Sequence, residues 1–536
     1  MQIVRSKGRN SEMKQKKFIT GMLGLVVSVS LLVSGCSGGA TTDNSTGETF
    51  DGGNEKPIEI SMANNWNIPK ADNNYVQKFL EEKFNVKFKN ISFETATWKE
   101  QFNVMLASGQ IPDIISVDGT VGDVVQWADQ GILASVSQEE IKQYMPKYTA
   151  DVESVDPNAW DPGTYNGKNW GVPKVWGEGA TGFIPAYNGQ WLKAIGYTEP
   201  PKNLAELEDV LTKFMNNDPD GNGKKDTYGL TGRGKDAQAQ LFNTVFAAYG
   251  VAPYQFKLDA NGKVTYGAIT EEARNALKLL NEWYKAGIID PEFITDGNSE
   301  IQTKFVSLRT GIIETGMWHH LYDDGYFGLI SKDKGIELVP GVPFSGPDGK
   351  KYAMANGALQ PPLLFGAQLE KDEAKRIKIL QILEYVTTDT EGYLTTVFGE
   401  KGNSYNLEGE LAVVTEAAAG TELMSELGAG FYNPFGAKVS SMMKHHYSPE
   451  KLAFKEKLTN VEGVTVLSDL MQSTVMKTKA QYEAILNTLQ AQYYIKAISG
   501  EANTDKDFDD FRSQWLNSGG QSELDEAQQI YEERSK

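Results

Sequence analysis

The stretch that decides the fold runs from residue 58 to residue 117 and opens with Ile58-Glu59-Ile60-Ser61-Met62. Apolar and polar side chains alternate in this opening, which predicts a β-strand with one face turned to a core. Behind Asp72, which we expect to cap a helix, apolar residues recur at helical spacing. Val86-Lys87-Phe88 then indicates the next strand. The order so far is strand, helix, strand.

The pattern repeats once more before residue 117. Thr97-Trp98-Lys99-Glu100 has the spacing of a capping box, and Gly109 is placed to end the helix that follows. Ile114-Ile115-Ser116-Val117 then predicts a third strand. Strands that alternate with helices in this way are typical of a parallel sheet with crossover helices, so we expect an α/β protein.

The first 36 residues indicate the compartment. Three lysines, at positions 14, 16 and 17, precede an apolar run from Phe18 to Val33 that is short for a stable membrane span. The run ends in Val33-Ser34-Gly35-Cys36, which resembles the bacterial lipobox, whose cysteine receives the lipid and becomes the mature N-terminus. An ordinary signal peptide and an uncleaved anchor are the alternatives. Met13 begins a complete leader of its own and competes with Met1 as the start.

Cys36 is the single cysteine of the chain. Disulfides, thiolate metal clusters and a cysteine nucleophile are therefore excluded from the mature domain. The residues behind it, up to Gly53, are mostly Ser, Thr, Gly, Asn and Asp, which bury too little apolar surface to fold. We expect a signal peptide over residues 1–35, a flexible tether over residues 36–56 and a body anchored to the membrane through its lipid alone.

The charge of the body limits its partners. The chain carries a formal net charge of −19, and removal of residues 1–35, which hold six basic and one acidic side chain, leaves −24. So acidic a body is not expected to bind nucleic acid or anionic membrane surfaces. An anionic ligand is disfavoured but stays open, because Lys174, Arg233 and Arg309 are local basic groups that can line a site.

Several segments of the body resemble the solute-binding proteins of ABC importers, family 1, especially the large carbohydrate-binding lipoproteins of Gram-positive bacteria. The similarity covers most of the mature chain and is carried, in chain order, by Ala107–Ile114, Tyr165–Pro173, Tyr187–Gly196, Pro201–Leu211, Gly287–Phe293 and Gly311–Trp318. The resemblance implies a receptor rather than an enzyme. Such a receptor is a monomer that holds a carbohydrate, an oligosaccharide by expectation, and delivers it to the membrane permease subunits of an importer.

The same resemblance implies a two-lobed, periplasmic-binding-protein-like fold of class II type. Each lobe is a sheet flanked by helices, with a cleft between the lobes and hinge strands that cross between them. We expect lobe one over residues 57–178 and 355–405, and lobe two over residues 179–354 and 406–536. The amphipathic segment from Thr270 to Gly287 is a packing helix in this scheme, with Trp283 in its core face.

Asp218-Pro219-Asp220-Gly221-Asn222-Gly223-Lys224-Lys225-Asp226 matches the first nine places of an EF-hand-type calcium loop. Its ligands are expected from the side chains of Asp218, Asp220, Asn222 and Asp226 and from the main-chain carbonyl of Lys224. Position 12 is Gly229, where an EF-hand has its bidentate glutamate, so the way in which the shell is completed stays open. A structural Ca²⁺ is the hypothesis, and a metal-free turn is the alternative.

A sugar site needs flat apolar faces and polar groups in a concave cleft, which in such sheets lies beyond the carboxyl ends of the strands. The residues expected there are Asn65, Trp66, Asp118, Trp176, Tyr187, Trp318 and His319. For each aromatic residue, ordinary core packing is the alternative.

Two other classes of protein stay open. With 71 acidic residues, carboxylate pairs suited to a glycoside hydrolase or lyase arise by chance, and no His-Glu-x-x-His or Gly-x-Ser-x-Gly motif accompanies the four histidines. The third class is a sugar-sensing or adhesive surface lipoprotein, which shares the anchor and the fold.

Overall fold

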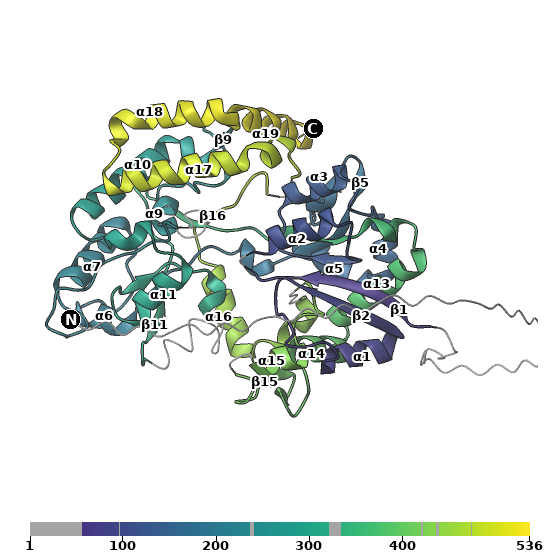
Figure 1. The fold of residues 1–536 in the computed structure, drawn as a ribbon. Coiled ribbons are helices and arrows are strands. Elements are labelled where there is room, and N and C mark those ends of the chain that lie inside the picture. The colour runs from purple at the N-terminus through teal and green to yellow at the C-terminus, as the bar shows by residue number, and fades with distance from the viewer. Residues whose placement is uncertain are drawn as a thin grey trace, which may run out of the picture. The chain divides into compact units, whose positions relative to one another are not determined.

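The stretch from residue 58 to residue 117 forms the centre of a five-stranded sheet in the computed structural model (Figure 1). The strand order is β2-β1-β3-β13-β6. The bounds are Ile58–Asn64 for β1, Val86–Ser92 for β2, Ile114–Ser116 for β3, Gly171–Val175 for β6 and Leu359–Phe365 for β13. β1 is parallel to β2 and β3, which confirms the expected parallel unit, whereas β13 is antiparallel to β3 and β6.

The structure describes residues 56–95, 97–235, 241–320, 334–419, 422–435, 439–472 and 474–535, and only the backbone of Trp318. Cys36, the leader and the tether therefore lie outside the described residues. No helix in the described ranges combines the length and the apolar character needed to cross a membrane.

Helices α1 (Tyr75–Phe84) and α2 (Trp98–Ala107) are the expected crossovers, but their caps differ from the sequence prediction. Asn74, not Asp72, caps α1: its side chain accepts a hydrogen bond from the backbone N of Gln77. Thr97 precedes α2 as predicted, yet its side chain makes no capping bond. Gly109 ends the segment with φ of 78°, in the left-handed region that favours glycine.

The first lobe, which we define as the part built on the five-stranded sheet, has one main apolar core between this sheet and its helices. Helices α1, α4 (Gln138–Tyr144), α5 (Pro146–Val155), α13 (Glu373–Thr388) and α14 (Thr390–Phe398) contribute to this core. Side chains from Ala412 to Met442 also join this core. Helices α2 and α3 (Val121–Asp129) belong to a second apolar cluster of the same sheet, and α15 (Glu422–Leu427) contacts α1. The lobe boundaries drawn from the sequence stay a prediction.

The second lobe is built on a three-stranded antiparallel sheet of order β10-β7-β11, with strands Ile312–Ile313, Ala186–Asn188 and Leu338–Pro340. Its helices are α6 (Gly189–Ala194), α7 (Leu204–Asn216), α9 (Asn243–Ala248), α10 (Glu271–Lys285), α11 (Asn298–Val306), α17 (Lys477–Ser499), α18 (Thr504–Trp515) and α19 (Gln521–Arg534). The predicted packing helix is α10, capped by Thr270, and Trp283 lies in its core. Outside both sheets, β8 (Phe256–Leu258) pairs with β9 (Val264–Tyr266), β14 (Tyr405–Glu408) with β15 (Leu411–Val414), and β4 (Thr164–Tyr165) with β5 (Lys168–Asn169).

Three chain segments cross between the lobes, and hydrogen bonds join them. The first follows β6, the second links β12 (Lys351–Met354) to β13, and the third includes α16 (Pro449–Thr459) and β16 (Val464–Leu467), the parallel partner of β12. The backbone N of Trp176 donates to Ala358 O at 2.7 Å, and Ala355 N donates to Leu467 O at 2.9 Å. The middle segment is therefore bonded on both sides.

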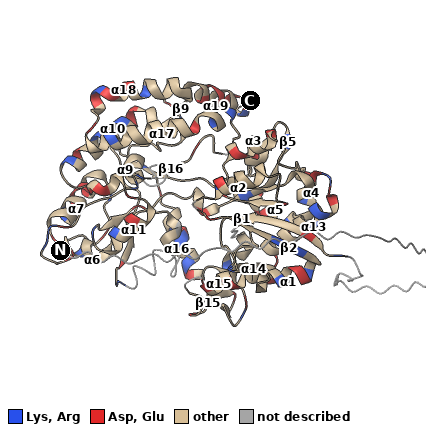
Figure 2. Cartoon of the chain, in the orientation of Figure 1, with Lys and Arg blue, Asp and Glu red and all other residues tan. Residues whose placement is uncertain are grey.

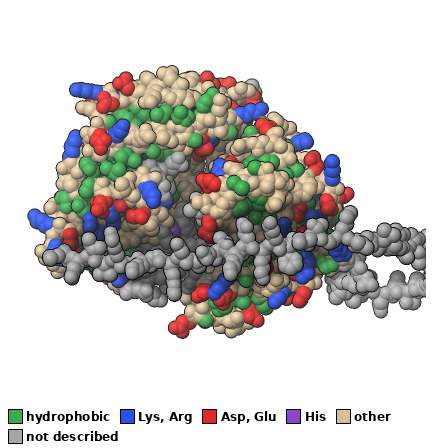
Figure 3. All heavy atoms as spheres, in the orientation of Figure 1, with side chains coloured by type: hydrophobic (Ala, Val, Ile, Leu, Met, Phe, Trp, Pro, Cys, Tyr) green, Lys and Arg blue, Asp and Glu red, His purple; other side chains and the backbone are tan. Residues whose placement is uncertain are grey.

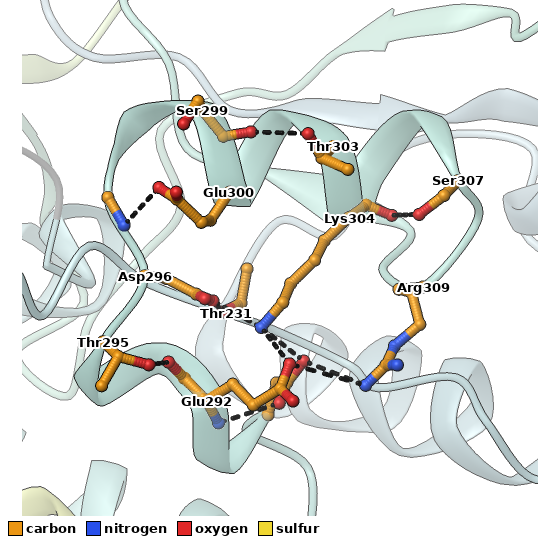
Figure 4. Close-up of polar contacts among 12 residues, drawn as sticks. Thr231, Glu292, Thr295, Asp296, Ser299, Glu300, Thr303, Lys304, Ser307 and Arg309 are labelled. Carbon is orange, nitrogen blue, oxygen red and sulfur yellow. Dashed lines mark hydrogen bonds and ion pairs between the residues drawn. The ribbon is translucent and has the colours of Figure 1, made fainter. Parts of the chain in front are cut away.

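A buried ion cluster supports the Gly287–Phe293 segment (Figure 4). Lys304 on α11 lies within 3.0 Å of carboxylate oxygens of Asp290 and Glu292, and its Nζ is 2.6 Å from Asp296 Oδ2. Asp290 is fully buried, so the lysine supplies the charge that makes its burial tolerable. Residues of the two charge signs are interspersed along the ribbon of both lobes (Figure 2), and hydrophobic side chains lie among charged ones on the face shown in Figure 3.

Candidate functional site

Two predicted residues meet where β1 and β3 end. Asn65 Nδ2 donates to Asp118 Oδ2 at 3.4 Å, and the backbone N of Asp118 donates to Asn65 Oδ1 at 3.2 Å. Asn65 is fully buried, whereas the adjacent Trp66 exposes 51% of its surface. Parallel strands end at the same edge of a sheet, which explains why the structure brings Asn65, Trp66 and Asp118 to one place.

A pocket of about 230 Å³ lies beside the end of β6, and we call it the Trp176 pocket. It is lined by Lys174, Val175, Trp176, Gly177, Glu178, Gln360, Phe435, Met443 and Lys455. Lys174 and Gln360 are paired positions on β6 and β13, at the edge of the first lobe's sheet.

Another part of the lining of the Trp176 pocket belongs to the third crossing segment. Lys455 is on α16, a helix that contacts the turn η5 (Met317–His320). Side chains of α16 and Met443 share an apolar cluster with Ile184 and Met317 of the second lobe. The pocket is thus bounded by the first lobe and by a segment packed on the second.

Glu178 is the buried carboxylate of this pocket. Tyr447 donates its hydroxyl hydrogen to Glu178 Oε1 at 2.7 Å, and the indole Nε1 of Trp176 donates to Oε2 at 3.3 Å. Burial, and then the charge of Glu178, raises the pKa of Tyr447, so its hydroxyl stays protonated and remains a donor. These bonds fix the carboxylate and orient the Trp176 ring.

Lys174 provides a cation in the same wall. Its side chain is half-buried, and burial lowers the pKa of its ammonium group, although the charge of Asp118 acts in the opposite direction. Within the described part of the chain, neither Lys174 nor Lys455 forms an ion pair or a side-chain hydrogen bond. Two ammonium groups in the pocket wall are therefore available to a ligand.

A larger pocket, of about 510 Å³, lies in the first lobe next to Trp66, and we call it the Tyr393 pocket. Its lining residues are Asn67, Ile68, Tyr393, Val397, Met424, Ser425, Ala429, Gly430, Asn433 and His446. Tyr393 and His446 are hydrogen-bonded, with 2.6 Å between the hydroxyl oxygen and Nε2. His446 directly precedes Tyr447, which binds Glu178, so consecutive residues connect the two pockets.

Three predicted ligand residues remain, namely Tyr187, Trp318 and His319. Tyr187 lies in the core of the second lobe with 1% of its surface exposed. The side chain of Trp318 lies outside the described residues. His319 is half-buried on η5, and its Nδ1 is bonded to Thr315 Oγ1. Burial, with the neighbouring His320, lowers the pKa of His319 to about 4, so its ring is neutral at neutral pH. Their roles as ligand contacts stay predictions.

The predicted calcium loop is folded into a tight turn around Asp218. Asp218 Oδ1 and Oδ2 accept hydrogen bonds from the backbone N of Asn222 at 3.1 Å and of Gly223 at 2.9 Å. Asn222 Nδ2 donates to Asp220 Oδ2 at 2.7 Å and to Asp226 Oδ1 at 3.2 Å. The Asn222 amide thus bonds both Asp220 and Asp226, and Asp218 bonds the backbone of the same turn.

Two observations bear on whether Ca²⁺ fits this loop. Asp220 Oδ1 is buried and has no hydrogen-bond partner in the described ranges, and burial together with Asp218 and Asp226 raises the pKa of Asp220. A bound cation would both contact the unbonded oxygen and neutralise the neighbouring carboxylates. Among the described residues, however, no three His, Cys, Asp or Glu side chains form a ready metal cluster. An oxygen shell requires the Asn222 amide, whose Nδ2 faces Asp220 and Asp226, to turn its Oδ1 toward the carboxylates.

The packing around Gly229, position 12 of the loop, explains why no glutamate side chain occupies this position. A Cβ at Gly229 would lie 2.8 Å from Leu211 Cβ, so no side chain fits there. Thr227, which follows Asp226, donates its hydroxyl hydrogen to Phe214 O at 2.8 Å and is buried away from the loop. Any further oxygen ligands therefore come from water or from main-chain carbonyls, which calcium accepts.

Sequence reasoning did not single out Glu178, Gln360, Phe435, Lys455 or Tyr447. Glu178 and Tyr447 are 269 residues apart, and neither belongs to a motif of recognised chemistry. Gln360 was accessible in principle, because it lies at the start of an apolar strand pattern whose other members face a core.

The fold and the pocket between two sheet-based lobes define a class of protein that holds a ligand between its lobes. The sequence matches the profile of the bacterial extracellular solute-binding proteins over residues 74–361, which is more than half of the chain. The chain therefore belongs to this family.

Individual relatives support the same class. The chain is 22% identical to lipoprotein LipO of Bacillus subtilis over 514 residues, which cover 94% of this chain and 96% of LipO. Among solved structures, it resembles the Streptococcus pneumoniae ABC-transporter substrate-binding protein FusA in complex with kestose, with a TM-score of 0.69 and 17% identity over 90% of this chain and 99% of FusA. It also resembles the alginate-binding protein AlgQ2 without calcium ion, with a TM-score of 0.66 and 21% identity over 89% and 98% of the two chains.

Proposed function

We propose that this protein is an extracellular receptor that binds a carbohydrate, an oligosaccharide, by closing its two lobes around it. The observation that carries the proposal is the Trp176 pocket. Its walls combine the aromatic side chains of Trp176 and Phe435 with the polar groups of Lys174, Glu178 and Gln360. Sugar rings present apolar C–H faces and hydroxyl groups, and this combination of side chains is complementary to both.

The position of the pocket explains how a ligand would favour the approach of the two lobes. A ligand in it touches β6 and β13 on one side and α16 on the other, so its contacts are more numerous when the lobes approach each other. Such a ligand shifts the protein toward its closed state by the difference in its affinity for the two states. Asn65, Trp66 and Asp118 extend the proposed binding surface along the sheet edge, and the Tyr393 pocket next to Trp66 offers room for further sugar units.

Delivery to an ABC importer completes the proposal. FusA, which shares the fold, is a substrate-binding protein of such a transporter. The permease subunits would recognise the closed receptor, which acts as a monomer. Cys36, behind the apolar leader, is the proposed lipidation site that holds the receptor at the outer face of the cell membrane, and the lipoprotein name of LipO is consistent with it.

We further propose a structural Ca²⁺ in the Asp218–Asp226 loop. Asp218, Asp220 and Asp226 supply carboxylate oxygens, Asn222 supplies its amide oxygen and Lys224 its carbonyl. The ion would neutralise the carboxylates at the end of α7 and would hold the loop in one conformation. AlgQ2, which has been solved without calcium ion, shares the fold.

Calorimetry on the mature protein tests the receptor function. We expect stoichiometric binding of one class of neutral or acidic oligosaccharides, with the sugar recovered unchanged after prolonged incubation. Accumulation of shorter products would contradict the proposal and would favour a glycoside hydrolase or lyase. Binding of free soluble sugar that does not depend on an importer would favour a sensory or adhesive surface protein instead.

A further inference from the structure

We propose that the ligand of the Trp176 pocket is an acidic saccharide, whose carboxylate is bound by the ammonium groups of Lys174 and Lys455. This inference rests on the proposed function and specifies the chemical class of its ligand. An anionic ligand is unexpected for a chain whose formal net charge is −19. The reason lies in the local composition of the pocket.

The pocket wall carries two cations and one carboxylate. That carboxylate, on Glu178, is held by the hydrogen bonds from Tyr447 and from the Trp176 indole described above. Neither lysine has an ion-pair partner among the residues that the structure describes. The lining itself thus holds one more cation than carboxylate, although the charge of Asp118 also acts on Lys174. Inside the pocket, a short-range attraction opposes the long-range repulsion of an anion by the acidic chain.

Three other lysines that are shielded from water have carboxylate partners, whereas Lys257, shielded to a similar degree, bonds the carbonyl of Gly250. Lys304 has three. Lys375 lies 3.4 Å from Asp113, and Lys479 lies 3.8 Å from Asp469. Lys174 is shielded to a similar degree but has no ion-pair partner among the described residues, and burial lowers the pKa of its ammonium group. An unpaired cation in a partly buried wall is costly, and an arriving anion offsets that cost.

The geometry favours a carboxylate on a sugar over a free anion. Lys174 comes from β6 and Lys455 from α16, so the two charges lie in walls that approach each other when the lobes close. The same lining includes Trp176 and Phe435, whose rings a small inorganic anion would leave uncovered. A sugar acid fills both requirements, because its ring packs on the aromatic faces while its carboxylate reaches the lysines.

The test compares saccharides that differ only in charge. Calorimetry with a set of oligouronides, their methyl esters and neutral oligosaccharides of the same length should show binding of an oligouronide. Esterification of that oligouronide should weaken binding roughly 10- to 100-fold, because a charge-assisted pair is lost. A neutral oligosaccharide that binds as tightly as any acidic one would overturn this inference and leave the receptor function intact. Absence of binding by the whole set would contradict the proposed function, and this inference with it.

Variants locate the effect. Lys174→Met and Lys455→Met should each weaken binding of the oligouronide about tenfold or more while leaving the affinity for its methyl ester within about twofold. Lys455 is on a helix surface, so its variant folds even if Lys174→Met disturbs β6. Lys263→Met, at an exposed turn between β8 and β9, is the matched control and should change neither affinity. Equal losses for acid and ester in both pocket variants would show that the lysines act through packing alone.

Discussion

The hydroxyl of Tyr447 lies 2.7 Å from Glu178 Oε1 and joins the third crossing segment to the first. Because both side chains are buried, the bond is shielded from water. Tyr447→Phe should lower the free energy of unfolding by about 1–3 kcal/mol, since it removes a donor from a buried carboxylate. Urea denaturation measures this. Tyr352→Phe removes a surface hydrogen bond to Asp348 and should cost clearly less; equal effects would contradict the expectation.

Trp176 should dominate the apolar part of ligand binding. Trp176→Ala removes the aromatic face of the pocket and one donor to Glu178, so we expect at least a tenfold loss of affinity, about 1.4 kcal/mol or more, by calorimetry. Trp98→Ala, in a half-buried indole on α2 outside both pockets, is the control and should leave affinity unchanged. Unaltered binding by the Trp176 variant would place the ligand elsewhere.

Lys304 should be indispensable to the second lobe. Lys304→Met leaves Asp290 and Asp296 buried without their main counter-charge, and we expect a loss of about 3–5 kcal/mol in unfolding free energy. The exposed pair between Lys193 and Glu337, 2.7 Å long, gives the comparison. Lys193→Met should cost less than about 1 kcal/mol. A small effect of the Lys304 change would mean that the carboxylates take up protons instead.

Glu523 predicts a pH dependence of stability. Burial, with the charges of Glu483, Glu526 and Asp469 nearby, raises the pKa of Glu523 from 4.5 to about 7, although Lys479 opposes this. Between these two values the unfolded chain holds fewer protons at this site than the folded chain, so the free energy of unfolding falls as pH rises. Glu523→Gln removes this dependence.

The Glu523 variant is tested by urea denaturation at a series of pH values. Relative to the parent protein, Glu523→Gln should gain at most about 3 kcal/mol between pH 4.5 and pH 7, and nothing further above that range. Glu533→Gln, on the exposed face of the same helix, serves as the control and should show no such trend. A pH-independent difference for Glu523→Gln would sink the prediction.

The calcium hypothesis makes opposite predictions with and without the ion. Asp220→Asn should leave stability unchanged or raise it slightly in a chelator, because it removes one of three converging negative charges. With millimolar Ca²⁺, the parent protein should melt several degrees higher by mass action, and the variant should not. Thermal melts with and without EGTA measure both. A parent protein that is indifferent to Ca²⁺ would favour the metal-free turn.

Much of the first lobe was predictable because its signals are local. The alternation in Ile58–Met62 and the left-handed glycine at Gly109 need no tertiary context, and β1, β3 and α2 lie where the sequence indicates. The cap of α1 was misplaced by two residues, since Asp72 and Asn74 are equally good caps by type. Backbone geometry selects Asn74, whose φ and ψ of −66° and 174° aim its side chain at Gln77 N.

The candidate site was predictable only where strand order determines position. Asn65 and Asp118 meet because parallel strands end together, a rule that sequence reasoning can use. The partnership of Glu178 with Tyr447, and the approach of Lys455 to Lys174, depend on how the third crossing segment returns from the second lobe. No local sequence pattern predicts the path of this segment. Tyr187 shows the same limit, because a position in the cleft was expected for it, with core packing as the alternative, and the structure buries it in the core of the second lobe.

The middle crossing segment has a consequence for the integrity of the receptor. Its backbone is bonded to both neighbours, and Gly357 adopts φ of 86° while donating to Gly179 O at 2.7 Å. A protease that cut the chain between residues 355 and 358 would leave two other covalent links between the lobes. We expect the nicked protein to migrate as one particle under native conditions and to separate into two fragments only in denaturant.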